Sequence, residues 1–294
     1  MTTFRKVKPL VLLFTIAATL WASSNAHAAR RTFTIYEYIP YSSHAVGGEV
    51  SQVPVLDEYL ESLGIHHVKV IYENRFMTDG KPDEKKIEAI AKSAISSPKV
   101  PVSFDTEFGD RFRPETVIPA VSEILRIYHQ VNSVTPAGVY ATAPQNTYAW
   151  KPDITKFDAL NEKYASIAQQ VDFLSPVLYN YGGPDNAAWQ KAAEYNIAAA
   201  KKYNTGKPII VYISPVMHPH QDSDDDAATK AHYRDIRMLT EAEMLLRLQT
   251  LYDLGADGCI VWASSGDRID GKPPVFDRNS GWGKALADFA ATHK

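Results

Sequence analysis

Short apolar runs, rich in β-branched and aromatic residues, recur along the chain at a nearly regular interval. They begin near Thr32, His67, Val100, Ala137, Val171, Lys207 and Asp257. The first six begin 33 to 37 residues apart, and the last follows after 50. Several of these runs are apolar at both odd and even positions, which is typical of strands covered on both faces. The pattern therefore predicts seven parallel strands.

Helical patterns fill the intervals between these runs. Predicted helices begin after Pro82-Asp83 and Pro114-Glu115, near Leu160 and Ala187, and after Thr240, and a closing helix runs from Gly281 to His293. Thr240 with Glu243 three residues later is a capping-box start, and Gly255 is a stop signal. Repeated strand–helix units of ~30 residues joined by short links are typical of a parallel sheet.

The expected fold is therefore α/β, a TIM-like (β/α) barrel of seven strands. A doubly wound open sheet is the alternative, but no Gly-rich phosphate loop follows the first strand, which disfavours a Rossmann fold. No eighth strand is evident, and the polar stretch from Gly266 to Ser280 is expected to be a loop. The 50-residue interval holds the acidic run Asp222 to Asp226, which is expected to lie in an inserted loop.

The first 28 residues have the pattern of a secretory signal peptide. Arg5, Lys6 and Lys8 precede the apolar run from Pro9 to Ala22, and Ala26-His27-Ala28 resembles a cleavage site. A membrane anchor is the alternative, but the run is short for a span of ~20 residues. We expect a signal peptide over 1–28, one barrel domain over 29–294, no membrane span after cleavage, and export to a periplasm or the medium.

Composition and charge narrow the function classes. Hydrophobic residues make up 45% of the 294, enough for a sizeable core. The single cysteine, Cys259, excludes an internal disulfide and a cysteine-based metal or iron–sulfur site, and its apolar neighbours predict burial. Removing the three basic residues of 1–28 changes the net charge from −3 to −6, which argues against nucleic acid as a partner.

Two carboxylates follow the third predicted strand, in Asp105-Thr106-Glu107. Active sites of such barrels lie at the carboxyl ends of the strands. Residues two apart on a strand share a face, with Cα atoms ~6.5 Å apart. Because two adjacent carboxylates cannot both ionise cheaply, one can stay protonated and act as an acid. The alternative is that the pair only begins a solvated loop.

The placement of both acids on one strand limits the chemistry. Ordinary glycosidases hold their two carboxylates on opposite sides of the scissile bond. Here neither acid can attack from the far face, so the nucleophile must come from elsewhere. The 2-acetamido carbonyl of a substrate is one source, as in substrate-assisted hydrolysis.

Other strand ends carry rings beside hydrogen-bonding groups, which suit a sugar with apolar faces and polar edges. These candidate substrate-contacting residues are Tyr72, Asn74, Arg75, Tyr179, Asn180 and Trp262. The alternative is that the rings belong to the core. A metal site at His218-Pro219-His220 has only weak support from spacing, so no metal and no other cofactor is expected.

Four segments resemble the hyaluronidases of glycoside hydrolase family 56, and together they span most of the chain. They are IYENRF (71–76), VSFDTEFGDRFRP (102–114), LSPVLYNY (174–181) and LTEAEMLLRLQTLYDLGADGCIVWASSGD (239–267). The resemblance implies a seven-stranded barrel. It also implies a retaining hydrolase for β-linked N-acetylhexosamine polysaccharides or oligosaccharides such as hyaluronan or chondroitin.

The resemblance also implies roles for single residues. Glu107 would be the proton donor to the leaving oxygen. Asp105 would orient the acetamido group and stabilise the oxazolinium-like intermediate. Tyr179 would bond that acetamido group, Trp262 would form the floor of its pocket and Tyr72 would line it. Tyr140 falls near a further site tyrosine of the family, with a spacing that differs by one residue.

The chain also differs from the family pattern. Thr106 stands where the family has Trp, the following loops are shorter, and no disulfide is possible. A net charge of −6 would repel a polyanion unless Arg75, Arg111 and Arg113 make the cleft locally basic. A neutral N-acetylglucosamine polymer or a bacterial wall glycan therefore stays open as substrate.

Two further alternatives stay open. One is a barrel that binds a glycan without cleaving it. The other is a chitinase-like hydrolase acting on chitin or peptidoglycan fragments. The chitinase motif is disfavoured because Pro101 and Ser103 occupy its two earlier acidic positions.

Overall fold

The computed structural model describes residues 31–44, 50–51, 53–145, 155–217 and 236–294, with no side-chain detail for 42–55. Residues 31–294 form one compact unit. The expected signal peptide (1–28), the histidines of 218–220 and the acidic run 222–226 lie outside the described residues.

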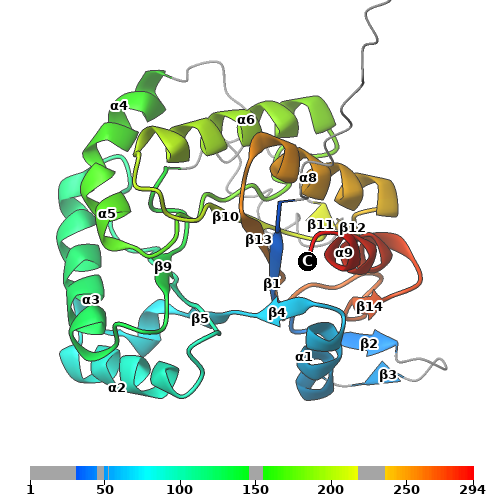
Figure 1. Ribbon diagram of the computed structural model, residues 1–294, viewed down its shortest axis with the longest axis horizontal. Coiled ribbons are helices and arrows are strands. Elements are labelled where there is room, and N and C mark those ends of the chain that lie inside the picture. Colours follow the sequence, from blue (N-terminus) through cyan, green and yellow to red (C-terminus); the bar gives the residue numbers. More distant parts are fainter. Residues whose placement is uncertain (1–30, 45–49, 52, 146–154, 218–235) are drawn as a thin grey trace, which may run out of the picture. The chain divides into compact units, whose positions relative to one another are not determined.

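Parallel strands form a ring with helices around it (Figure 1). The ring strands are β1 (Thr34–Tyr38), β4 (Ile65–His67), β5 (Lys69–Ile71), β8 (Val102–Phe104), β9 (Ala137–Val139), β10 (Ile210–Ile213) and β13 (Gly258–Trp262). β1 pairs with β4 and β13, β13 pairs with β10, and β8 lies between β5 and β9. β4 and β5 occupy one position, separated by Val68, whose N–H donates to the Glu37 carbonyl.

The predicted strand near Val171 is not a continuous strand: it meets the β10 side of the ring through isolated parallel bridges, Leu174 to Ile209 and Val177 to Tyr212. On the β9 side, the N–H of Asp172 donates to the Ala137 carbonyl. Pro176 lies between the two bridges and has no N–H to donate, although its carbonyl accepts from the N–H of Tyr212. With this segment, the described residues supply seven strand positions. The predicted α/β barrel is confirmed, and the fifth strand is less regular than its apolar run suggested.

Most helices begin close to the expected places, whereas α1 (Val53–Ser62) was not predicted. The helices are α1, α2 (Glu84–Ile95), α3 (Ile118–Val131), α4 (Thr155–Lys163), α5 (Ala165–Gln170), α6 (Asn186–Lys202), α8 (Glu241–Leu254) and α9 (Gly281–Thr292), with 3-10 turns η1 (Glu73–Arg75) and η2 (Pro114–Thr116). Thr240 and Glu243 form the predicted capping box of α8, and Gly255 ends it at φ 86°. The helix expected from Leu160 is instead two short helices, beginning at Thr155.

Short strands outside the ring were not foreseen. They are β2 (Ser42–His44), β3 (Val50–Ser51), β6 (Met77–Thr78), β7 (Lys81–Pro82), β11 (Val216–Met217), β12 (Arg237–Met238) and β14 (Val275–Asp277). β14 pairs with β2 inside the stretch expected to be loop, so that expectation was wrong. Three residues are too few to give a periodic signal, although the middle one, Phe276, is fully buried.

Two apolar clusters stabilise this arrangement. The larger lies between the ring and its helices, and the smaller fills the ring with inward-facing side chains such as Val68, Phe173 and Ile260. Gly138 on β9 is needed for this filling, because a Cβ there would lie 2.4 Å from the ring of Phe173. The inner cluster ends in aromatic residues, including Tyr140, and these line the candidate site.

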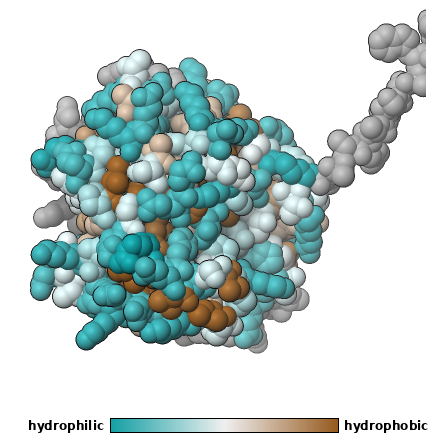
Figure 2. Space-filling model, turned by 60° about the vertical axis from the view of Figure 1, so that its left-hand side comes forward, coloured by the Kyte–Doolittle hydropathy of each residue, from teal (hydrophilic) through white to brown (hydrophobic). Residues whose placement is uncertain are grey.

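Hydrophilic side chains cover most of the face shown in Figure 2, and hydrophobic ones appear in narrow patches between them. No helix in the described part of the chain has both the length and the apolar character of a membrane span. Cys259 on β13 is fully buried, as expected, and burial raises the pKa of its thiol.

Candidate active site

Asp105 and Glu107 lie side by side just beyond β8. The N–H of Asp105 donates to the Ile71 carbonyl at 2.8 Å, so the strand-like path continues past Phe104. Thr106 points the opposite way, is 1% exposed, and shares a 2.7 Å hydrogen bond between its Oγ1 and that of Thr142. The alternation therefore directs both carboxylates to one side of the sheet.

Both carboxylates line a cavity of about 130 Å³ at the end of the barrel's inner cluster. The remaining lining residues are Val70, Tyr140, Tyr179, Tyr181, Tyr212 and Trp262. They come from the carboxyl-end halves of five ring positions, which is where the active sites of such barrels lie.

The aromatic walls are fixed by contacts among themselves. The rings of Tyr179 and Trp262 stack with centroids 5.6 Å apart, and Tyr140 meets Tyr212 edge to face at 5.1 Å. The hydroxyl of Tyr212 donates to Ser103 Oγ at 2.7 Å. These contacts restrict the rings to one orientation before any ligand arrives.

Asp105 has an unusual electrostatic environment. Burial, followed by the charge of Glu107, raises the pKa of its carboxyl from 3.8 to about 7, although the Arg111 guanidinium acts in the opposite direction. Its Oδ1 is buried and has no hydrogen-bond partner in the described structure. A ligand N–H would supply the missing bond, since buried acceptors are normally paired.

Arg111 is held beside the cavity. Its guanidinium carbon lies 5.8 Å from the centroid of the Tyr140 ring, and Nη1 donates to the Ala141 carbonyl at 3.2 Å. Ala141 adopts φ 50°, which L-residues rarely do and which is common where function constrains the backbone. The turn after β9 thus holds the guanidinium of Arg111 beside Tyr140, where its positive charge lowers the pKa of Asp105.

Comparison with known proteins gives structural likeness without sequence likeness. No family model and no curated protein matches the chain. Bee venom hyaluronidase superposes with a TM-score of 0.52 at 14% identity, over 79% of this chain and 91% of that one. Its complex with a hyaluronic acid tetramer gives 0.53 at 15% identity over the same shares.

A spore cortex-lytic enzyme, SleL of Bacillus megaterium, gives a TM-score of 0.48 at 12% identity, over 90% of this chain and 75% of that one. This chain has the barrel fold of bee venom hyaluronidase. At these identities the likeness concerns the fold alone, so the chemistry is argued from the site.

The structure gathers five of the residues predicted from the sequence around one cavity: Asp105, Glu107, Tyr140, Tyr179 and Trp262. Tyr72 lies at the edge of this group, more than a third exposed, with its Oη accepting from Nε1 of Trp262 at 3.4 Å.

Three predicted residues lie elsewhere. Asn180 is buried, donates to the carbonyls of Ser214 and Val216, and accepts from Arg247 Nε at 2.7 Å. Its side chain therefore links the end of the fifth strand segment to β11 and α8. Asn74 and Arg75 line a different pocket, beside α2.

Val70, Tyr181 and Tyr212 also line the cavity but were not predicted to belong to the site. The alternation of side chains along a strand could have indicated two of them. Tyr181 is two residues after Tyr179, and Tyr212 is two residues after the inward-facing Ile210.

Possible metal ligands gather outside the cavity. In the described residues, Glu37, Asp57 and His67 have ligand atoms within 4.8 Å of one another. Glu37 is 1% exposed, and its Oε1 lies 3.1 Å from Nδ1 of His67 while Oε2 accepts from the N–H of Ile39. Glu37 therefore already has partners for both of its oxygens.

The raised pKa of Asp105 predicts a pH-dependent stability cost. The native carboxyl binds a proton more tightly than the unfolded chain, so the free energy of unfolding falls as pH rises from 3.8 towards about 7. Asp105→Asn removes this cost. Its midpoint of thermal unfolding should exceed that of the wild type by more at about pH 8 than at about pH 4.

The matched control is Glu115→Gln, which neutralises an exposed carboxylate on η2. Its midpoint should follow that of the wild type at both pH values. A gain for Asp105→Asn that is equal at the two pH values would contradict a buried carboxyl with a raised pKa.

Proposed function

We propose that this chain is an exported retaining glycoside hydrolase related to the family 56 hyaluronidases. Its substrate would be a β-linked N-acetylhexosamine glycan of the hyaluronan or chondroitin kind, cleaved with help from the substrate's own acetamido group. One observation carries the proposal: two carboxylates from a single strand end share one aromatic-walled cavity. The likeness to bee venom hyaluronidase, whose complex contains a hyaluronic acid tetramer, supports a glycan ligand.

The cavity is compact, with a volume of about 130 Å³. We assign it to the acetamido group of the substrate. An acetamido group has four heavy atoms and presents a methyl, a carbonyl and an N–H. The stacked rings of Tyr179 and Trp262 offer an apolar wall for the methyl. Burial raises the pKa of Tyr179 well above its usual range, so its hydroxyl stays protonated and can donate to the carbonyl.

Asp105 is suited to receive the acetamido N–H at its buried, unpaired Oδ1. That bond favours the ionised form of Asp105. Glu107, on the same side of the cavity, is the group that we assign as the acid.

The reaction then has two steps. Glu107 gives its proton to the glycosidic oxygen as the acetamido carbonyl oxygen attacks the anomeric carbon and the leaving sugar departs. The cyclic intermediate is positively charged, and ionised Asp105 stabilises it. Water next attacks the anomeric carbon and gives a proton to Glu107, which restores the acid and leaves the product with retained configuration.

The participation of the acetamido group can be tested on the substrate. For a glycan that the protein cleaves, removal of the acetyl groups should lower kcat/KM by about 10²-fold or more, because a positioned intramolecular nucleophile supplies a large rate factor. Product formation is followed by reducing-end assay for both polymers at equal chain length. Equal cleavage of the two forms would contradict substrate assistance while leaving glycosidase activity intact.

A further inference from the structure

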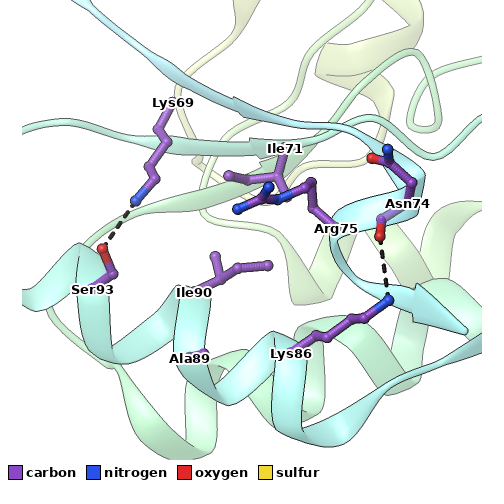
Figure 3. Close-up of a pocket in the computed structure, with 8 residues that line it drawn as sticks. All are labelled: Lys69, Ile71, Asn74, Arg75, Lys86, Ala89, Ile90 and Ser93. Atoms are coloured by element: carbon purple, nitrogen blue, oxygen red, sulfur yellow. Dashed lines mark hydrogen bonds between the residues drawn. The ribbon is translucent and has the colours of Figure 1, made fainter.

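A second pocket, of about 440 Å³, lies between β5 and α2 (Figure 3). We call it the basic pocket, and it is lined by Lys69, Ile71, Asn74, Arg75, Lys86, Ala89, Ile90 and Ser93. Its volume falls within the range typical of small-ligand sites.

The basic pocket carries three cations and no carboxylate among its lining residues, although the whole chain has a net charge of −3. Lys69 Nζ donates to Ser93 Oγ at 3.1 Å, and Lys86 Nζ donates to the carbonyls of Met77 and Asn74 at 2.7 and 3.3 Å. These neutral acceptors fix the two ammonium groups without neutralising them. None of the ion pairs between described residues involves Lys69, Arg75 or Lys86.

Apolar side chains form the middle of the pocket. Figure 3 shows Ile71 and Ile90 between the lysines, with Arg75 extending across the same space. Ile71 is 7% exposed, and Ile90 on α2 is half-buried. A ligand that fits has an apolar face for the isoleucines and an anionic group for the cations. A sugar ring bearing a carboxylate or a phosphate has both.

We propose that the basic pocket binds an anionic sugar, separately from the Asp105–Glu107 cavity. Strand alternation separates the two sites, since Val70 lines the cavity while Lys69 and Ile71 line the basic pocket. The proposal therefore does not depend on the proposed hydrolase activity. It also gives Arg75 a role other than contact with the reacting sugar.

Calorimetric titration at low ionic strength tests this with glucuronate, glucose 6-phosphate, glucose and inorganic phosphate as separate ligands. At least one acidic sugar should bind, and the stronger of the two identifies carboxylate or phosphate as the preferred group. If glucose binds as tightly as either acidic sugar, the charge of the ligand plays no part in recognition. If inorganic phosphate binds as tightly as glucose 6-phosphate, the sugar ring plays no part. If neither acidic sugar binds, the proposal as a whole is overturned.

Variants locate the binding. Arg75→Gln alters an exposed side chain and should weaken the acidic sugar about tenfold, the loss expected for one charge-assisted contact. Lys69→Gln serves as the second test of the lining. Lys92→Gln removes an equal charge from α2 outside the lining, where Lys92 pairs with Glu88, and should bind like the wild type. Unchanged affinity in both lining variants would overturn the proposal, as would weakened binding in Glu107→Gln.

Discussion

Glu107→Gln lowers kcat by about 10² to 10⁴-fold on any glycan that the wild type cleaves, the range attributed to a single general acid–base group. Glutamine keeps the size of the side chain but has no proton acidic enough for the leaving oxygen. Because the side chain of Glu107 is exposed, the midpoint of thermal unfolding should stay at the wild-type value. Steady-state kinetics and thermal unfolding of the same preparation measure both quantities.

Glu115→Gln is the matched control for this variant, since Glu115 is an exposed carboxylate a few residues along the same segment. It should retain wild-type turnover. If Glu107→Gln keeps a turnover within a few-fold of the wild type, Glu107 is not the general acid. The proposed mechanism would then lack a group that protonates the leaving oxygen.

Asp105→Asn should give the second-largest loss, about 10² to 10³-fold in kcat, comparable with removal of one electrostatic stabiliser of a transition state. The asparagine carbonyl can still accept the acetamido N–H, so KM should change little. What it lacks is the negative charge that opposes the positive charge of the cyclic intermediate. The loss should therefore appear in kcat more than in KM.

This split separates a catalytic from a binding role for Asp105. The buried Oδ1 without a partner shows that the native fold leaves this atom unsatisfied, so the substitution should not unfold the protein. A rise in KM with unchanged kcat would instead assign Asp105 to substrate binding alone. The pH-dependent gain in stability described above provides an independent check that the variant folds.

The regular spacing of apolar runs was enough to predict the barrel, because each strand–helix unit repeats the same burial pattern. The spacing alone did not predict that Pro176 would interrupt the fifth strand and leave separate bridges. That effect depends on Pro176 lacking an N–H on the side that faces β10, which only the pairing of the folded chain reveals. β14 could not be predicted from the burial pattern because only Phe276 of its three residues is fully buried. Pairing with a distant segment, β2, determines that strand.

Alternation along single strands placed Asp105 and Glu107 on one side correctly, because the strand-like backbone continues past the end of β8. The same rule puts Asn180 on the opposite side from Tyr179, where it bonds Arg247. Arg75 is the last residue of the 3-10 turn η1, where strand alternation no longer applies, so the direction of its side chain could not be inferred from the pattern.

The raised pKa of Asp105 depends on burial and on three charges, only some of them near it in sequence. The Asp–Thr–Glu spacing indicated that one carboxyl would resist ionisation. It did not indicate that this would be Asp105, because the main cause is the burial of that side chain in the folded protein. Asp105 is half-buried while Glu107 is exposed.

The most direct test of the account is mass spectrometry of products from hyaluronan, chondroitin, chitin oligomers and peptidoglycan, with wild type and Glu107→Gln side by side. The account predicts saturated oligosaccharides with an N-acetylhexosamine at the new reducing end, from at least one of these glycans, in the wild type only. Even-numbered products from hyaluronan or chondroitin would match the proposed substrate, and products only from chitin or peptidoglycan would change the substrate but keep the chemistry. No product from any glycan, with binding still measurable, would contradict the hydrolase and favour a glycan-binding barrel.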